Sequence, residues 1–382
     1  MDFSLSHEQV MLKDHLASFS KRELNHHLAD KEQQGEFIWE SWKKCSAMGL
    51  TGLLIPKEYG GMGGDLMTGL IGMEALSYGC KDGGLMMALV TQICCGVQIL
   101  LFGSPSQKTE YLPAMGSGKE IAAQALTEPD AGSDVRSMKM KARRFQDKYI
   151  LNGTKVFISN GPIADLVILF AGEEDPKESP LRGLSCLLVE KGTKGFHHGK
   201  ALEKMGLKTL QSGELIFEEC EVPAGNLIGR QGQGMFIFNE VIEWERALVS
   251  AYHLGIMERI LERCTEYAKT RRQFGRPIGK FQSVSNKIAE MKVNLELGKL
   301  VLYKAGWMKD QKRRAPLETS MSKLFISESL KEACLEAIQI HGAQGYMKEF
   351  EVERELRNSV ASTIYSGTSE IQRNIISSLV GL

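Results

Sequence analysis

The hydrophobic periodicity of this chain changes twice along its 382 residues, and this order constrains the fold more than any single motif. Residues 1–118 and 236–382 repeat apolar side chains at helical spacing, whereas residues 119–235 show short alternating runs separated by Asn-Gly and Lys-Gly turns. Helices and strands therefore do not alternate, which excludes a Rossmann fold built from βαβ units. We predict an α+β protein in three domains with these bounds, helical at both ends, whose middle domain is a β-sandwich or barrel.

The composition is that of an ordinary globular protein with balanced charge. Lys plus Arg and Asp plus Glu both number 47, and no basic run of nucleic-acid type occurs, so we expect no nucleic acid partner. The eight cysteines are scattered without a Cys-x-x-Cys pair or zinc spacing, which predicts no metal site and a reduced, cytoplasmic protein. The apolar stretch 83–103 contains threonine and glutamine, so we interpret it as a core helix that carries Cys94 and Cys95, not as a membrane span.

A glycine-rich segment, IPKEYGGMGGD over residues 55–65, separates two helical stretches of the N-terminal region. Glycine-rich loops can cradle phosphate, but this one follows no clear strand and lacks the Lys-Ser/Thr pair of a P-loop. A plain turn is the favoured interpretation.

Glu245 is the carboxylate with the most apolar surroundings. Its neighbours three and four positions away are Val241, Ile242, Leu248 and Val249, which place it within an apolar stripe of a helix. Burial raises the pKa of a carboxylate, as a general base working near neutrality requires. A structural ion pair with an Arg or Lys of a neighbouring helix is the alternative, and periodicity does not separate the two.

Glu243, two residues earlier, has a different environment. Its neighbours at the same offsets include Asn239, Glu240 and Arg246, so the pattern predicts a solvated face for this side chain.

Two segments of the middle region offer polar groups to a ligand. QALTEPDAGSDVRS over residues 124–137 is rich in N–H and hydroxyl donors, although it would also serve as a plain connection before the first strand. In KVFISNG, Phe157 and Ser159 lie two apart on one strand face. A ring and a hydroxyl so placed could meet a flat cofactor, but half-buried strands commonly have this composition.

The segment KTRRQFGRPIGKFQ over residues 269–282 follows a helix that we expect to end near Gly275. Arg271 and Arg272 suit the C-terminal dipole of such a helix. Beside Gln273 and Phe274 they equally suit a pyrophosphate and an adenine ring.

Seven segments, in order, resemble the acyl-CoA dehydrogenase superfamily: IPKEYGG, LTEPDAGSD, YILNGTKVFISNG, KMGLKTLQSGELIFEECEVP, YAKTRRQFGRPIGKFQ, QIHGAQGY and IYSGTSEIQR. The resemblance covers essentially the whole chain. It implies FAD as cofactor, a C-terminal four-helix bundle after the helical and β domains, and a homotetramer.

Carried over by position, the resemblance assigns three groups of residues to FAD. The flavin is expected to be lined by Leu126, Thr127, Ser133, Phe157 and Ser159. The diphosphate and adenosine are expected to be held, largely across a subunit interface, by Arg271, Phe274, Gln282, Gln339 and Gly342. The loop that closes over the cofactor is expected to include Thr368 and Glu370.

The reaction of the family removes two hydrogens from the carbons α and β to a thioester. A carboxylate takes the α proton, the flavin accepts the β hydride, and hydrogen-bond donors to the thioester carbonyl stabilise the enolate. The base is most often a Glu in a Y-E-G-T loop, where this chain has Ser366, whose hydroxyl is too weak an acid to replace it.

A subset resembling isovaleryl- and long-chain-type dehydrogenases carries this Glu in a Glu-Arg pair on a helix, which corresponds here to Glu245 and Arg246. The resemblance therefore implies Glu245 as the base. It places Ser366, through its backbone N–H, and also Arg246 and Tyr365 beside the thioester of the substrate.

Several stretches, including LSYGCKDGGL, ISNGPIAD and the IEWE context of Glu245, are similar to the branch that oxidises prolyl groups tethered to carrier proteins. We therefore expect a prolyl substrate on an acyl or peptidyl carrier protein. A short- or branched-chain acyl-CoA is the alternative, and a catalytically silent, flavin-binding member is a remote one. Electron-transfer flavoprotein or oxygen would accept the electrons.

An acidic carrier protein calls for a locally basic docking surface on this uncharged chain. Two basic segments are candidates, Lys309–Pro316 and Lys139–Arg144. Taken singly, the first is better interpreted as a solvated loop and the second as a strand edge.

Overall fold

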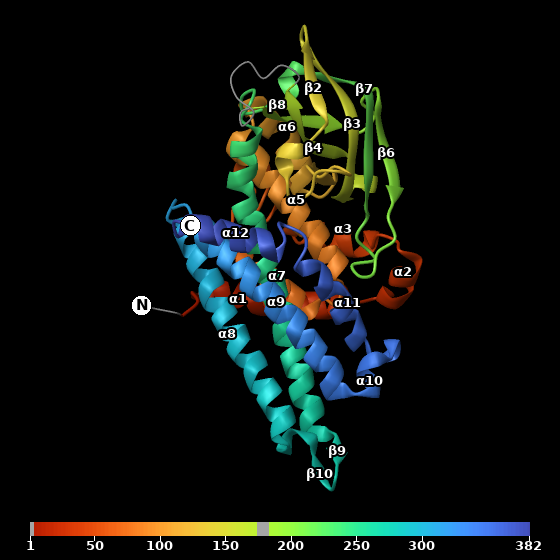
Figure 1. Cartoon of the computed structure of the whole chain (residues 1–382), viewed down its shortest axis with the longest axis vertical. Coiled ribbons are helices and arrows are strands. Elements are labelled where there is room, and N and C mark those ends of the chain that lie inside the picture. Colours follow the sequence, from red (N-terminus) through yellow and green to blue (C-terminus); the bar gives the residue numbers. More distant parts are fainter. Residues whose placement is uncertain (1–3, 174–182) are drawn as a thin grey trace.

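The computed structural model describes residues 4–173 and 183–382 of the chain. Helices come first, strands follow, and helices return, in the order that the periodicity predicts. Figure 1 shows the β domain at one end of an elongated molecule and the long C-terminal helices running to the other end. The predicted α+β class is confirmed.

The N-terminal helices are short apart from α5. They are α1 (His7–Glu23), α2 (Leu28–Gln34), α3 (Trp39–Ala47), α4 (Leu66–Gly79), α5 (Gly83–Phe102) and α6 (Pro105–Gly116). Helix α1 begins with a capping box, in which the Ser6 hydroxyl accepts the Gln9 N–H and the Gln9 side chain accepts the Ser6 N–H. Ser104 and Gln107 form the same box at the start of α6.

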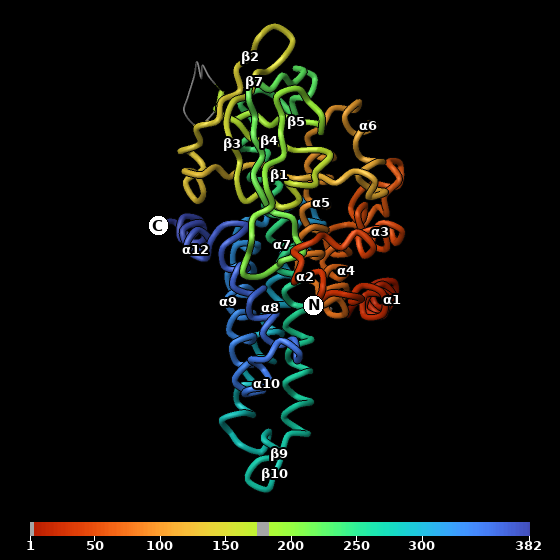
Figure 2. Tube along the Cα trace, turned by 90° about the vertical axis from the view of Figure 1, so that its right-hand side faces the viewer, coloured from red at the N-terminus to blue at the C-terminus, as the bar shows by residue number. Residues whose placement is uncertain are grey.

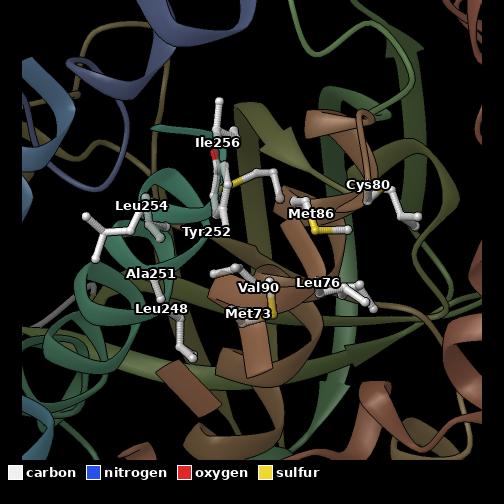
Figure 3. Close-up of a cluster of buried hydrophobic side chains, with 14 of the residues drawn as sticks. Met73, Leu76, Cys80, Met86, Val90, Leu248, Ala251, Tyr252, Leu254 and Ile256 are labelled. Carbon is white, nitrogen blue, oxygen red and sulfur yellow. The ribbon is translucent and has the colours of Figure 1, made fainter. Parts of the chain in front are cut away.

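Helix α5 is the core helix of this domain. It is long and apolar enough to span a membrane, and most of its side chains are buried inside the structure. Figure 3 shows how its Met86 and Val90 lie in one apolar cluster with Met73 of α4 and with Leu248 and Tyr252 of the later helix α7 (Gly234–Thr270). Cys94 and Cys95 are both buried and free, as the core-helix interpretation predicts.

The glycine-rich segment forms a turn, as predicted. The N–H of Gly60 donates to Lys57 O, that of Gly61 to Pro56 O and that of Gly63 to Ile55 O. These amides are used within the segment itself, so they are not free to cradle a phosphate.

The middle domain is one mostly antiparallel sheet in the described residues. Its strands are β1 (Ala122–Ala125), β2 (Lys141–Phe145), β3 (Lys148–Ser159), β4 (Leu166–Glu173), β5 (Leu184–Glu190), β6 (Phe196–Ala201), β7 (Ser212–Pro223) and β8 (Leu227–Ile228). The spatial order is β6-β7-β3-β2-β4-β5-β8, and β1 pairs with β4 in parallel.

Strand β4 is buried on both faces, which explains why its sequence is continuously apolar. Val167 and Leu169 point into the core of the sheet. Ile168 and Phe170 point to the opposite side, where they pack with Ile99 of α5 and other side chains of the N-terminal helices. The sheet and the N-terminal domain therefore share one apolar interface.

The C-terminal region is dominated by three long helices. Its elements are α7 (Gly234–Thr270), β9 (Arg272–Gln273), β10 (Arg276–Pro277), α8 (Gln282–Asp310), α9 (Pro316–His341), α10 (Ala343–Tyr346), α11 (Val352–Ser362) and α12 (Ser369–Leu379). Helices α7, α8 and α9 pack against one another, and α11 and α12 pack against α9. Figure 2 shows this bundle extending away from the sheet.

Helix α7 crosses from the N-terminal domain into the bundle without a break over 37 residues. A Cβ added at Gly255 would lie 2.1 Å from Glu74 O, so this glycine permits the close approach of α7 to α4. The helix ends at Thr270 and not near Gly275, contrary to the prediction. The reason is that Gly275, with φ of +77°, forms the turn of the β9–β10 hairpin instead of a helix C-cap.

Candidate active site

Glu245 of α7 meets Ser366 of the loop between α11 and α12. The Ser366 hydroxyl donates a hydrogen bond to Glu245 Oε1 at 2.5 Å. Burial is the largest influence on this carboxyl and raises its pKa, while the Ser366 hydrogen bond and the charges of Arg246 and Lys323 act to lower it. Glu245 forms no salt bridge with any residue that the structure describes. Its geometry therefore fits a general base better than a structural ion pair.

Glu243 is buried, so the predicted solvated face is wrong. Its side chain is about 1% exposed, and its Oε2 accepts hydrogen bonds from Lys309 Nζ at 3.0 Å and from the Ala315 N–H at 3.2 Å. The prediction from residues three and four positions away failed because α7 is enclosed by the N-terminal helices on one side and by α8 and α9 on the other. A helix enclosed in this way has no single solvated face.

The Ser366 loop is held by cations and an amide from three helices. Arg246 Nε and Gln372 Nε2 donate to Ser366 O at 3.3 and 3.2 Å, and Lys323 Nζ donates to Gly367 O at 2.7 Å. Ser366 has φ of +55°, a left-handed conformation that non-glycine residues adopt rarely. These contacts fix the loop carbonyls on one side and leave the Ser366 hydroxyl aimed at Glu245.

Lys323 is a site residue that sequence reasoning missed. It lies on α9 and is fully buried, and burial lowers its pKa to about 8. Arg246 is also buried, which lowers the pKa of its guanidinium to about 10. The two cations stabilise the negative charge of Glu245. The one sequence signal is the pair of serines in SMSK, whose small side chains permit close packing of the backbone next to Lys323.

The Tyr365 hydroxyl is engaged in a buried cluster of side chains. Its hydroxyl bonds to that of Tyr252 and to His253 Nε2, the latter at 2.8 Å. Burial lowers the pKa of His253 to about 3, so the imidazole is neutral. The placement of Tyr365 beside a substrate thioester remains a prediction, since its hydroxyl is already engaged.

The residues expected to line a flavin lie on two segments, the 124–137 loop and the end of β3, which are hydrogen-bonded to each other. The backbone N–H of Val156 donates to Thr127 O at 3.0 Å, which joins the 124–137 loop to β3. Phe157 is 69% exposed with φ of +60°, because β3 has a bulge between Lys155 and Ile158. Leu126, Thr127 and Ser159 are half-buried nearby in the chain, and Ser133 is exposed.

A buried ion pair supports this loop and was not foreseen. Lys155 Nζ donates to Glu128 Oε1 and to Leu126 O, each at 2.9 Å. Glu128 also accepts the N–H groups of Lys139 and Met140. Lys155 is fully buried, so its charge is retained only while Glu128 is present. The strand pattern gave no sign of this, because a lysine in an alternating run is normally solvated.

The residues expected to hold adenosine lie elsewhere. Tyr267 Oη donates to His341 O at 3.3 Å, so the end of α7 adjoins the end of α9. Figure 1 shows the β9–β10 hairpin at the end of the bundle opposite the β domain. All members of the group are exposed: Arg271, Phe274, Gln282, Gln339 and Gly342. Thr368 caps α12 next to the Ser366 loop, and Glu370 is exposed.

Three family models match successive parts of the chain. They describe the N-terminal, middle and C-terminal domains of acyl-CoA dehydrogenases and match residues 6–119, 123–220 and 232–380.

Individual relatives and solved structures agree with these matches. An L-prolyl-[peptidyl-carrier protein] dehydrogenase of Serratia sp. is 40% identical, covering 100% of this chain and 99% of its own length. The crystal structure of the prolyl acyl carrier protein oxidase AnaB superposes with a TM-score of 0.96 at 45% identity and covers 99% of this chain and 100% of its own. The structure of PigA with FAD and proline superposes with a TM-score of 0.97 at 39% identity, with full coverage of both chains.

Proposed function

The chain belongs to the acyl-CoA dehydrogenase family, and from this premise we propose that it oxidises a prolyl group carried as a thioester on a peptidyl carrier protein. The observation that carries the chemistry is the 2.5 Å hydrogen bond from the Ser366 hydroxyl to the Glu245 carboxylate, which has no salt-bridge partner among the described residues. The prolyl substrate is supported by the Serratia relative, by the similarity to the prolyl acyl carrier protein oxidase AnaB, and by the similarity to PigA, whose structure contains proline.

FAD fits the residues of the 124–137 loop and the end of β3. The exposed ring of Phe157 offers a stacking face, and Gln124 Oε1 is a buried acceptor without a partner in the described structure, suited to an N–H of a flavin. When bound, FAD would supply the acceptor for the hydride that leaves the β carbon. Lys155 would hold the 124–137 loop in place for it through Leu126 O.

The chain itself would handle the α proton. Glu245 would accept the proton from the α carbon, and burial, which raises the pKa of this carboxyl, makes it a stronger base than an exposed glutamate. The backbone N–H of Ser366 donates to no group within the described residues, so it is free to stabilise the developing negative charge on the thioester carbonyl. Arg246 acts on the loop through Ser366 O.

Anaerobic reduction of the flavin by defined thioesters tests this function. We expect prolyl-carrier protein to bleach the flavin absorbance, and isovaleryl-CoA and butyryl-CoA to do so slowly or not at all. Bleaching by the CoA esters alone would instead identify a short- or branched-chain acyl-CoA dehydrogenase.

Glu245→Gln tests whether the protein is a catalyst. We expect the variant to bind flavin and stay yellow while reduction by substrate is lost, because glutamine cannot take a proton. A variant that is reduced as fast as the wild type would support the catalytically silent alternative.

We also propose that the protein is a homotetramer. Three large apolar side chains repeat along one face of α8 and are each about half exposed: Val293, Leu297 and Leu300. A second copy covering this face would bury them. The exposed adenosine group at the hairpin end would then serve FAD bound mainly to a neighbouring subunit.

The electron acceptor and the compartment complete the proposal. Electron-transfer flavoprotein or oxygen would reoxidise the flavin, and mixing the reduced protein with each separately distinguishes them. A cytoplasmic location is supported by the eight cysteines, which are all free and buried.

A further inference from the structure

We propose that the carrier protein docks on the loop that joins α8 to α9, with Lys312 and Arg313 as its contact cations. The inference rests on the proposed function, because it concerns the partner that delivers the substrate. It selects one of two basic segments that the sequence left open.

The loop is attached to the turn of α7 that carries the catalytic carboxylate. Lys309 Nζ, just before the loop, pairs with Glu243 at 3.0 Å and lies 5.6 Å from the ring centroid of Trp244. Arg314 Nη2, within the loop, pairs with Glu240 at 2.9 Å. Glu243 is two residues from Glu245, about 3 Å along the helix axis, and its side chain leaves α7 on the opposite side. A protein seated on this loop would therefore stand about one helix diameter, roughly 10–12 Å, from the reaction centre, a distance that a tethered substrate can bridge.

The tip of the loop carries positive charge that the chain does not neutralise. Lys312 and Arg313 are exposed, and neither forms a salt bridge with any residue in the described ranges. The guanidinium of Arg313 lies 5.7 Å from the ring centroid of Trp307, which limits its conformations without consuming its charge. Lys312 has φ of +57°, so the backbone turns sharply there. Lys309 and Arg314, by contrast, are committed to glutamates of α7.

The rival segment fits the role less well. Lys139 pairs with Asp130 at 2.6 Å, and Arg144 lies over the ring of Tyr149. Strand β2 lies within the sheet, between β3 and β4, and Figure 1 shows it at the outer end of the β domain. In the part of the chain that is described, the main packing partners of β2 are β3 and β4, and α7 is not among them. A carrier bound there would hold its arm away from the carboxylate.

An acidic surface is the partner chemistry that this loop fits. Unpaired cations at a rim act mainly on the encounter rate and on the orientation of a charged partner, and their effect weakens with salt. The prolyl group itself needs no such charge, so the loop would matter for a substrate on a carrier protein and not for a small thioester.

The test compares three substrates and two double variants. Lys312→Glu with Arg313→Glu reverses the charge of the loop, and Lys141→Glu with Arg144→Glu makes the same change of net charge on β2. Each is assayed with prolyl-carrier protein and with prolyl-pantetheine, which carries neither protein nor phosphate. Prolyl-CoA is a third substrate.

We expect the loop variant to raise KM for prolyl-carrier protein at least tenfold with kcat within twofold, and to leave KM for prolyl-pantetheine and prolyl-CoA unchanged. The β2 variant should resemble the wild type with all three. Equal KM values for the two variants on the carrier substrate would overturn the docking site while the proposed function stands. An increase of KM with prolyl-CoA as large as with the carrier would also overturn it, since the cations would then bind phosphate. If no prolyl thioester reduces the wild-type flavin, the proposed function itself fails.

Discussion

Removing the Ser366 hydroxyl is expected to change the pH at which the enzyme works. The hydroxyl donates to Glu245 at 2.5 Å and stabilises the ionised carboxylate, which lowers its pKa against the effect of burial. Ser366→Ala deletes this hydrogen bond and leaves the cations of Arg246 and Lys323 in place. The ionised base becomes harder to form, so more of the enzyme is protonated and inactive at a given low pH.

The size of this change follows from the hydrogen bond. A bond to a charged group contributes about 1.5–3 kcal/mol. Glu245 and Ser366 are both half-buried, so solvent screening favours the lower end of this energy range. Because one pKa unit corresponds to about 1.4 kcal/mol, the acid limb of the kcat/KM profile should move up by about one pH unit. The plateau at high pH should fall little, since the base itself remains.

Stopped-flow reduction of the flavin by prolyl-carrier protein, followed from pH 5 to 9, measures the limb. Ser366→Gly is the matched control, because glycine also lacks the hydroxyl but tolerates the φ of +55°. Both variants should show the same displacement. A limb that stays at the wild-type position in both would refute the reasoning, and a displacement in the alanine variant alone would assign the effect to backbone strain.

Three further predictions concern stability, each measured by urea unfolding. Burial lowers the pKa of Lys323 from 10.5 to about 8, so the unfolded chain binds the proton more tightly and stability should rise between pH 8 and 10.5; Lys323→Met should lose this part of the slope. Lys155→Ala should cost about 3–5 kcal/mol because Glu128 is left buried and unpaired, and a second change, Glu128→Gln, should recover part of it. Gly255→Ala should cost about 1–3 kcal/mol by overpacking α7 against α4, whereas Gly225→Ala, with open space around its Cβ position, should be nearly neutral.

The residue proposed as the base could be singled out from the sequence, whereas the burial of Glu243 could not be predicted. The apolar offsets around Glu245 reflect a real turn of α7, so periodicity located the residue that the Ser366 loop meets. The same offsets failed for Glu243, because they describe one helix and its burial depends on Lys309 from α8 and Ala315 before α9. Local pattern predicts which residues share a helix face, and only the packing of distant helices decides which faces are solvated.

The buried lysines mark the same limit. The sequence pattern predicts ordinary solvated positions for Lys155 and Lys323. Each is fully buried instead, and each supports a loop of the site by donating a hydrogen bond to a backbone carbonyl. Their partners are 29 and 44 residues away along the chain, beyond any local pattern. The order of helices and strands was predictable because it depends on periodicity within each segment.

The outward position of Phe274 has a consequence for the protein in dilute solution. Its ring is 91% exposed on the hairpin that follows α7, and Glu245 lies 25 residues (270 − 245) before the end of that helix, about 38 Å along its axis, so one chain alone cannot enclose both ends of a dinucleotide between these two places. Under the proposed assembly, retention of FAD depends on a neighbour. Cofactor would then escape as the protein concentration falls below that at which subunits separate, and specific activity per chain would decline on dilution even though every chain remains folded.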